Sequence, residues 1–242
     1  MEENRKMRPA FILLNRGEKI AGWIYFPFYV LIISLVLAVI FMLIGRDVQA
    51  PGNLLYLHLL YGVINFCVLT VCFHKYLGKS LRQVRQFPGR FFAAVGIGFA
   101  IYYFGTVLMT ILVQLVEPGL ENINDNALGG LAEHGMILMI IYTVLLVPTV
   151  EELMFRGLIF SSIRPRSRFW AYAVSMVAFS LMHVLAYVGS YPLRTLLLCF
   201  LQYLPASFGL AWALEYSGSI WASIGVHTIA NLVAMLAMAF MK

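Results

Sequence analysis

Six polar or charged residues interrupt long apolar stretches in the second half of this 242-residue chain. They are Glu151, Glu152, Arg156, His183, His227 and Asn231. A charged side chain inside a membrane-like apolar segment costs on the order of a few kcal/mol or more, so each of these residues is a candidate functional residue. Carboxylates, imidazoles and amides can move protons, stabilise a developing negative charge and bind metal ions.

Helical spacing gives the first three residues different roles. Glu152 and Arg156 are four residues apart, so they share a helix face and are expected to form an ion pair. Glu151 points about 100° away from Glu152 on an ideal helix and lacks a local cation, which leaves it free to act as an acid or base. Pro148 cannot donate a backbone hydrogen bond, so a kink or local opening is expected just before this acidic pair.

The other three candidates belong to two further apolar segments. His227 and Asn231 are four residues apart and present an imidazole and an amide toward one point. His183 follows Phe179 by one helical turn, and the two side chains are expected to pack together. Counting about 1.5 Å per residue places the candidates roughly 10 to 21 Å into their segments, which favours one shared, water-containing cavity.

Two kinds of chemistry fit this set. A glutamate and a histidine can hold a water molecule whose proton the glutamate removes during attack on a carbonyl, while a second histidine and an amide stabilise the oxyanion. Equally, Glu151, His183 and His227 could bind Zn²⁺ and leave an open coordination position for water. The residue types alone do not separate the metal-free glutamate mechanism from the zinc mechanism.

The composition shows where these residues must lie. Hydrophobic residues make up 62% of the chain, charged residues make up 12%, and the mean hydropathy is +0.85. A soluble globular chain is about half apolar and about a quarter charged, so this composition indicates an integral membrane protein. The net charge of +6 comes from short basic clusters between apolar runs, so the predicted partners are the lipid bilayer and a membrane-associated peptide or protein, with no nucleic acid.

Seven apolar stretches are long enough to cross a bilayer as helices. Their approximate limits are Ala21 to Gly45, Leu54 to Phe73, Phe91 to Val116, Met136 to Ile163, Phe169 to Val188, Thr195 to Tyr216 and Ile220 to Met241. The predicted fold class is therefore all-α, a polytopic transmembrane bundle with its catalytic core in the last four spans. Gly96 and Gly98, within the third stretch, are expected to allow close helix packing.

Basic residues mark one side of the predicted membrane protein. Thirteen Lys and Arg residues fall before the first span, between the second and third, and between the fourth and fifth. They are Arg5, Lys6, Arg8, Arg16, Lys19, Lys75, Lys79, Arg82, Arg85, Arg90, Arg164, Arg166 and Arg168. The opposite side carries only Arg46, Arg194 and Lys242, so the N-terminus is expected in the cytoplasm and the C-terminus outside.

Missing motifs exclude several classes of intramembrane protease. The chain has no H-E-x-x-H and no G-x-S-G sequence. Its two aspartates, Asp47 and Asp125, are expected in loops, which argues against an intramembrane aspartyl dyad.

Three motifs, in this order, resemble those of the CPBP family of intramembrane peptidases. This family, also called Abi, includes CAAX prenyl proteases and bacteriocin-processing enzymes. The motifs are EELMFR (Glu151 to Arg156), FSLMH (Phe179 to His183) and HTIAN (His227 to Asn231). The resemblance covers about Met136 to the C-terminus. It predicts three parts: a cytoplasmic segment at residues 1–20, accessory spans and loops at 21–135, and a protease core at 136–242.

The resemblance also implies a role for each motif residue. Glu151 and His183 would activate water, His227 and Asn231 would form the oxyanion site, and Glu152 would pair with Arg156. The implied activity is that of a membrane endopeptidase. Such enzymes are often classed as metalloendopeptidases, and the cofactor stays open between none and zinc.

Other interpretations remain open at this level. A noncatalytic peptide-binding scaffold or bacteriocin self-immunity factor could use the same cavity, and membrane Glu and His residues also relay protons in transporters. Short loops and a compact chain favour a bacterial cell membrane, where secreted peptides or membrane-protein tails are the expected substrates.

Overall fold

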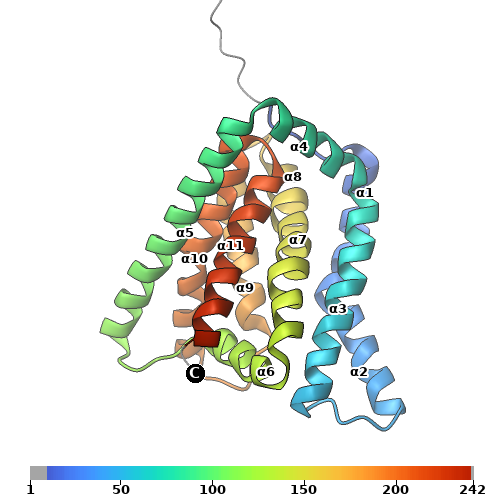
Figure 1. The fold of residues 1–242 in the computed structure, drawn as a ribbon, viewed down its shortest axis with the longest axis vertical. Helices are drawn as coiled ribbons and strands as arrows, with labels where there is room; N and C mark the ends of the chain where they lie inside the picture. The colour runs from blue at the N-terminus through green and yellow to red at the C-terminus, as the bar shows by residue number, and fades with distance from the viewer. Residues whose placement is uncertain (1–9, 241–242) are drawn as a thin grey trace, which may run out of the picture.

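The computed structural model describes residues 10–240, which are almost entirely helical (Figure 1). Within this range there is no β-strand, only an isolated bridge between Val188 and Tyr191. Seven helical runs in the described part are long and apolar enough to cross a membrane. These runs are Arg16–Leu43, Pro51–Cys72, Pro88–Val116, Ile123–Ile163, Arg168–Leu185, Leu193–Ser217 and Ile220–Phe240. The predicted polytopic helical bundle is confirmed.

Each predicted span overlaps a different one of these runs, and the ends differ by several residues. The largest difference is at the fourth, which was expected to start at Met136 and starts at Ile123. Asn122 caps this helix by accepting hydrogen bonds from the backbone N–H groups of Asn124 and Asp125, so the expectation that Asp125 lies in a loop is wrong. The backbone leaves helical geometry at Gly135, which separates this added helical segment from the apolar part of the run.

Some residues used in the sequence arguments lie outside the described range. They are Arg5, Lys6, Arg8, Met241 and Lys242.

Several of the long runs consist of more than one element. The elements are α1 (Arg16–Pro27), η1 (Phe28–Ile32), α2 (Ile33–Leu43), α3 (Pro51–Cys72), α4 (His74–Gln86), α5 (Pro88–Val116), α6 (Ile123–Ile140), η2 (Ile141–Leu146), α7 (Val147–Glu152), η3 (Leu153–Phe160), α8 (Ser161–Ile163), α9 (Arg168–Leu185), α10 (Leu193–Ser217) and α11 (Ile220–Phe240). The segments η1, η2 and η3 are π-helical, with wider turns than an α-helix. Two of them flank α7, the short helix that carries the acidic pair.

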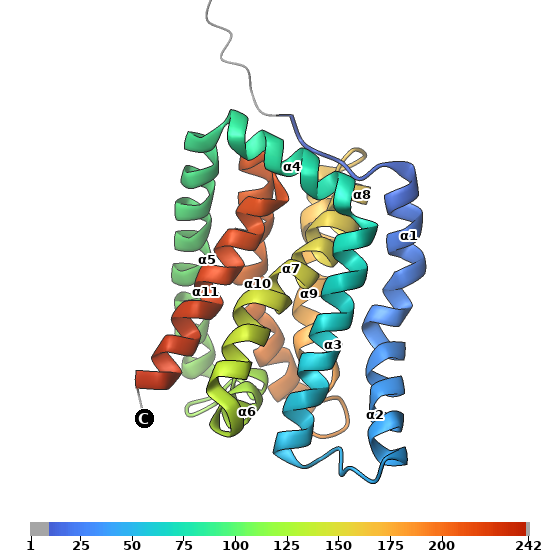
Figure 2. The same ribbon diagram turned by 45° about the vertical axis from the view of Figure 1, so that its right-hand side comes forward.

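The spans surround the α7 region (Figures 1 and 2). Helix α10 packs against α5, α9 and α11, whereas α3 packs against α6, η2 and α7. Helix α4 crosses one end of the bundle and joins α3 to α5, and the start of α1 and α8 lie at this same end. We call it the basic end, because the basic residues of α1, α4 and the α8–α9 turn gather there; α11 ends at the opposite end.

Close approach of α5 to its neighbours depends on a glycine. A Cβ added at Gly98 would lie 2.9 Å from Ala213 Cβ of α10 and 3.1 Å from a Val226 methyl group of α11. Gly96 is exposed, and a Cβ there would meet nothing within 4 Å. The expectation of close packing therefore holds for Gly98 and is wrong for Gly96, because the two glycines face different sides of the helix.

Candidate active site

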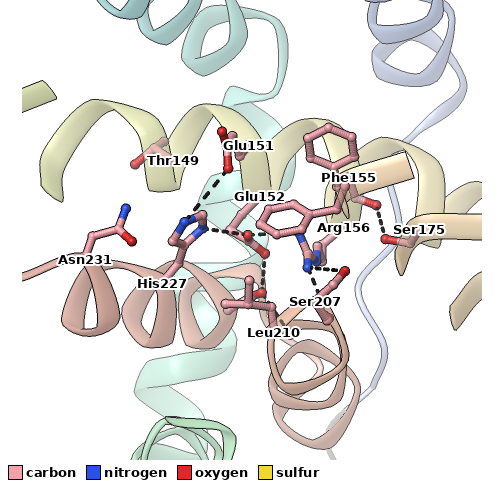
Figure 3. A network of polar contacts seen from close by, with 12 residues as sticks. Thr149, Glu151, Glu152, Phe155, Arg156, Ser175, Ser207, Leu210, His227 and Asn231 are labelled. Atoms are coloured by element: carbon pink, nitrogen blue, oxygen red, sulfur yellow. Dashed lines mark hydrogen bonds and ion pairs between the residues drawn. The ribbon is translucent and has the colours of Figure 1, made fainter. Parts of the chain in front are cut away.

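The Glu152 carboxylate is the centre of a buried polar cluster formed by α7, η3 and α11 (Figure 3). Its Oε1 atom lies 3.1 Å from Arg156 Nη1 and 2.9 Å from His227 Nδ1. Its Oε2 atom accepts a hydrogen bond from the Ser223 hydroxyl. The Glu152 and Arg156 side chains are both 0% exposed, so they need this dense set of partners to offset the loss of water.

The Arg156 guanidinium is held by α10 as well as by Glu152. Its Nη2 atom donates to the Ser207 hydroxyl at 2.9 Å and to the Ser207 backbone carbonyl at 3.1 Å. The guanidinium carbon lies 4.3 Å above the centroid of the Phe179 ring, a cation–π arrangement. One arginine thus connects η3 to α9 and α10, the helices that surround the site.

The Glu151 carboxylate is separate from this ion pair and only 18% exposed. Its Oε2 atom is buried, has no hydrogen-bond partner within residues 10–240, and lies 3.9 Å from His227 Nε2. Beside Glu151 is a cavity of about 20 Å³ that is otherwise lined by Tyr29, Tyr61, Gly62, Tyr142, Val147 and Val150. A polar cavity of this size can hold about one water molecule.

Asn231 completes the hydrogen bonding of a π-helical turn. In η2, the Val147 backbone N–H donates to the Tyr142 carbonyl, five residues earlier, and not to Thr143. In the same pattern the donor for Thr143 would be residue 148, which is a proline without an N–H. The buried Thr143 carbonyl instead accepts a hydrogen bond of 2.7 Å from Asn231 Nδ2. The local opening expected at Pro148 is therefore present, and α11 satisfies the group that it frees.

His183 lies near this cluster but outside its hydrogen bonds. Its Nδ1 atom lies 2.9 Å from the Phe179 carbonyl, which can only accept, so in a neutral ring Nδ1 carries the proton and Nε2 is the acceptor. The imidazole stacks on the Tyr203 ring with a centroid distance of 4.1 Å. The Phe179 ring contacts both His183 and His227, at centroid distances of 4.6 and 5.9 Å. The expected packing of Phe179 beside His183 is present.

The structure thus brings together five of the six predicted site residues and sets His183 apart. His227 lies between the two glutamates, with Nδ1 toward Glu152 and Nε2 toward Glu151, and Asn231 lies one turn further along α11 (Figure 3).

Sequence reasoning missed several residues of this site. They are Ser207, Ser223, Tyr29, Tyr61, Tyr142 and Tyr203. Ser223 could have been found, because it precedes His227 by four residues on the same helix face. Tyr29 and Tyr61 could not have been found in this way, because they come from distant spans that contain no motif residue.

The described side chains do not form an evident metal site. Between residues 10 and 240, no three His, Cys, Asp or Glu side chains are grouped so that they could hold a metal ion. Of the possible zinc ligands, Glu151 and His227 are neighbours, whereas His183 is not grouped with them. This donor arrangement does not fit a three-ligand zinc site.

The fold and the site define a class of protein. It is a polytopic helical membrane protein with a carboxylate–imidazole–guanidinium cluster buried among its spans. Residues 133–233 match the family model described as type II CAAX prenyl endopeptidase, Rce1-like. The match is consistent with the resemblance to CPBP peptidases, and it supports a CAAX-type intramembrane endopeptidase that acts on peptides.

The matched segment contains all six predicted site residues and none of the first three spans. No curated protein and no solved structure matched the chain.

Proposed function

We propose that Glu151 is the general base of this intramembrane endopeptidase and removes a proton from the water that attacks a peptide carbonyl. The observation that carries the proposal is the buried Glu151 Oε2 atom, which has no hydrogen-bond partner among the described residues and belongs to a side chain that lines a cavity of about 20 Å³. A carboxylate in this setting can orient a water molecule and accept its proton. The neighbouring His227 Nε2, at 3.9 Å, is close enough for one water molecule to contact both groups.

His227 and Asn231 are the proposed oxyanion site. Asn231 Nδ2 has two hydrogens, and only one is directed to the Thr143 carbonyl, so the other can reach a substrate oxygen. His227 Nδ1 is directed at Glu152, so its Nε2 atom faces the Glu151 side, where it donates when the ring carries both protons. In this proposal Glu152 orients His227, and Arg156 compensates the charge of Glu152.

His183 is proposed as the second residue that activates water. Its Nε2 atom is the free acceptor of the ring, as this role requires. Phe179 contacts both His183 and His227, so the two imidazoles lie beside the same aromatic ring. The role of His183 therefore needs a test of its own, separate from that of Glu151.

The finer biological assignments are proposals as well. We propose a bacterial cell membrane with the N-terminus in the cytoplasm, and a protease core at residues 136–242 that follows accessory spans at 21–135. The substrates would be secreted peptides, bacteriocin precursors or membrane-protein tails. The family description adds prenylated C-terminal peptides as a class to test.

The decisive experiment compares peptide termini in membranes from cells that express wild-type protein or Glu151→Gln at equal levels. Loss of a general base lowers the rate by about 10² to 10⁴, so termini produced by the wild type should vanish in the variant. Glu121→Gln is the matched control, because Glu121 is exposed and bonds only to Asn126, outside the cluster. His183→Gln, measured in parallel, should also abolish these termini if His183 activates water.

Two outcomes would overturn parts of this proposal. Identical termini in wild type and Glu151→Gln, together with a cellular phenotype that persists in the variant, would favour the noncatalytic scaffold or immunity factor. Loss of peptidase activity after treatment with a chelator, restored by Zn²⁺ alone, would replace the metal-free mechanism with the zinc alternative.

A further inference from the structure

A groove at the basic end lies between α1 and α8 and is separate from the proposed active site. It has a volume of about 550 Å³ and is lined by six residues. They are Lys19, Ile20, Trp23 and Ile24 of α1, Ser162 of α8 and Arg166 of the following turn. Both views place the start of α1 and α8 at this same end of the bundle (Figures 1 and 2).

The shape of the groove follows from how α1 packs. Glu18 and Gly22 are buried on one face of α1, and a Cβ added at Gly22 would lie 2.8 Å from both Leu158 of η3 and Phe73. This close contact turns the adjacent face of α1 toward the groove. Lys19 is nearest the start of the helix, and Trp23 lies one turn, about 6 Å, further in.

The cations of the groove are not neutralised by neighbouring acids. In the part of the chain that the structure describes, neither Lys19 nor Arg166 has an ion-pair partner. Glu18, next to Lys19, accepts backbone N–H groups of Asn15 and Tyr76. Two nearby arginines, Arg164 in the turn and Arg168 at the start of α9, both form ion pairs with Glu215, and Arg166 does not.

The remaining lining residues of the groove are one serine and three apolar residues. Ser162 Oγ is buried and has no hydrogen-bond partner in the described part of the chain, so its hydroxyl is a neutral donor beside the two cations. Ile20, Trp23 and Ile24 are 51%, 46% and 65% exposed, on a helix long and apolar enough to cross a membrane. The groove thus offers two cations and a hydroxyl beside an exposed apolar surface formed by Ile20, Trp23 and Ile24.

We infer that this groove binds an anionic phospholipid, with its phosphate between Lys19, Arg166 and Ser162 and an acyl chain along Ile20, Trp23 and Ile24. Ammonium, guanidinium and hydroxyl groups donate to phosphate oxygens, and basic residues at the membrane surface attract anionic headgroups. Cationic groups beside exposed aromatic and aliphatic side chains match the charged headgroup and the apolar chain of one lipid molecule. The inference does not depend on the proposed peptidase activity.

The test measures lipid binding to the purified full-length protein by native mass spectrometry. Phosphatidylglycerol is compared with phosphatidylcholine of identical acyl chains for the wild type, for Lys19→Gln with Arg166→Gln, and for Ser162→Ala. The matched control is Arg82→Gln with Arg85→Gln. It also removes two positive charges, but from exposed residues of α4 at the same end of the bundle. Thermal unfolding of each variant checks that the protein is folded.

We expect the groove pair to weaken phosphatidylglycerol binding by about tenfold or more, and the α4 pair to change it by less than about threefold. Ser162→Ala should weaken it by about threefold, and phosphatidylcholine should bind less tightly than phosphatidylglycerol to the wild type.

Three results would overturn the inference. Equal losses in the two double variants would indicate diffuse attraction to a charged surface. Equal affinity for phosphatidylglycerol and phosphatidylcholine would show that Lys19 and Arg166 do not select an anionic headgroup. Displacement of phosphatidylglycerol by an equimolar amount of inorganic phosphate would indicate a site for free phosphate and not for a lipid.

Discussion

Glu152 and Arg156 are buried on the same helical run, and each compensates the opposite charge of the other. Removing one partner from a buried ion pair leaves an uncompensated charge, which costs about 3–5 kcal/mol. We therefore expect Glu152→Gln to lower the free energy of unfolding by about this amount, measured by thermal or denaturant unfolding in detergent. Glu152→Gln combined with Arg156→Met should recover much of the loss, because no lone charge remains.

The control for this prediction is an ion pair at the surface. Glu117 and Arg194 lie 2.9 Å apart, and their side chains are 34% and 66% exposed. Glu117→Gln should change the stability by less than about 1 kcal/mol. A loss in Glu152→Gln no greater than in Glu117→Gln would contradict a central structural role for the Glu152 cluster.

At the scale of single elements, the wide turn of η2 depends on Pro148 and Asn231 together. Asn231→Leu leaves the buried Thr143 carbonyl without a donor and should cost about 1 kcal/mol of stability. Pro148→Ala restores an N–H five residues after Thr143, where it can donate in the π-helical pattern. In the Pro148→Ala background, Asn231→Leu should therefore cost less than half as much.

A double-mutant cycle of unfolding free energies measures this coupling. Additive effects of the two substitutions would mean that Asn231 does not replace the missing backbone donor. Peptidase assays on the same variants separate this structural contribution from the proposed oxyanion role, because Pro148→Ala does not restore an amide at residue 231.

The packing of α5 gives a second prediction for an element. Gly98→Leu must displace α10 or α11 and should cost about 2 kcal/mol or more. Gly96→Leu adds the same side chain to the same helix on its exposed face and should stay within about 0.5 kcal/mol of the wild type. Similar unfolding temperatures for the two variants would argue against this helix contact.

For the whole molecule, the distribution of basic residues predicts the orientation in the membrane. In a cysteine-free background, Gln86→Cys places a thiol at the end of α4 and Gln49→Cys places one in the loop before α3, at the opposite end. Both residues are exposed. A membrane-impermeant maleimide added to intact cells should label only Gln49→Cys, and both after lysis. Labelling of only Gln86→Cys in intact cells would reverse the proposed orientation.

Much of the bundle could be predicted from the sequence, because spans are encoded locally in the length of apolar stretches and in the charges between them. The Glu152–Arg156 pair could also be predicted from local sequence, because residues four apart on one helix share a face. The cavity beside Glu151 could not be predicted, because Tyr29 and Tyr61 reach it only through the packing of separate spans. The helical start of α6 at Ile123 was missed because its polar residues resemble a loop.

The Glu152–Arg156 pair also has a consequence for the synthesis of the chain. The run Ile123–Ile163 is made before α10 and α11, which later supply Ser207, Ser223 and His227. A lone charge near the middle of an inserting helix costs about 2.5–3.5 kcal/mol on insertion scales. Because Arg156 belongs to the same run as Glu152, the two can enter the bilayer as a neutral pair. Their hydrogen bonds to Ser207, Ser223 and His227 form later, when α10 and α11 have been inserted. The order of synthesis thus matches the order in which the charged centre can be completed.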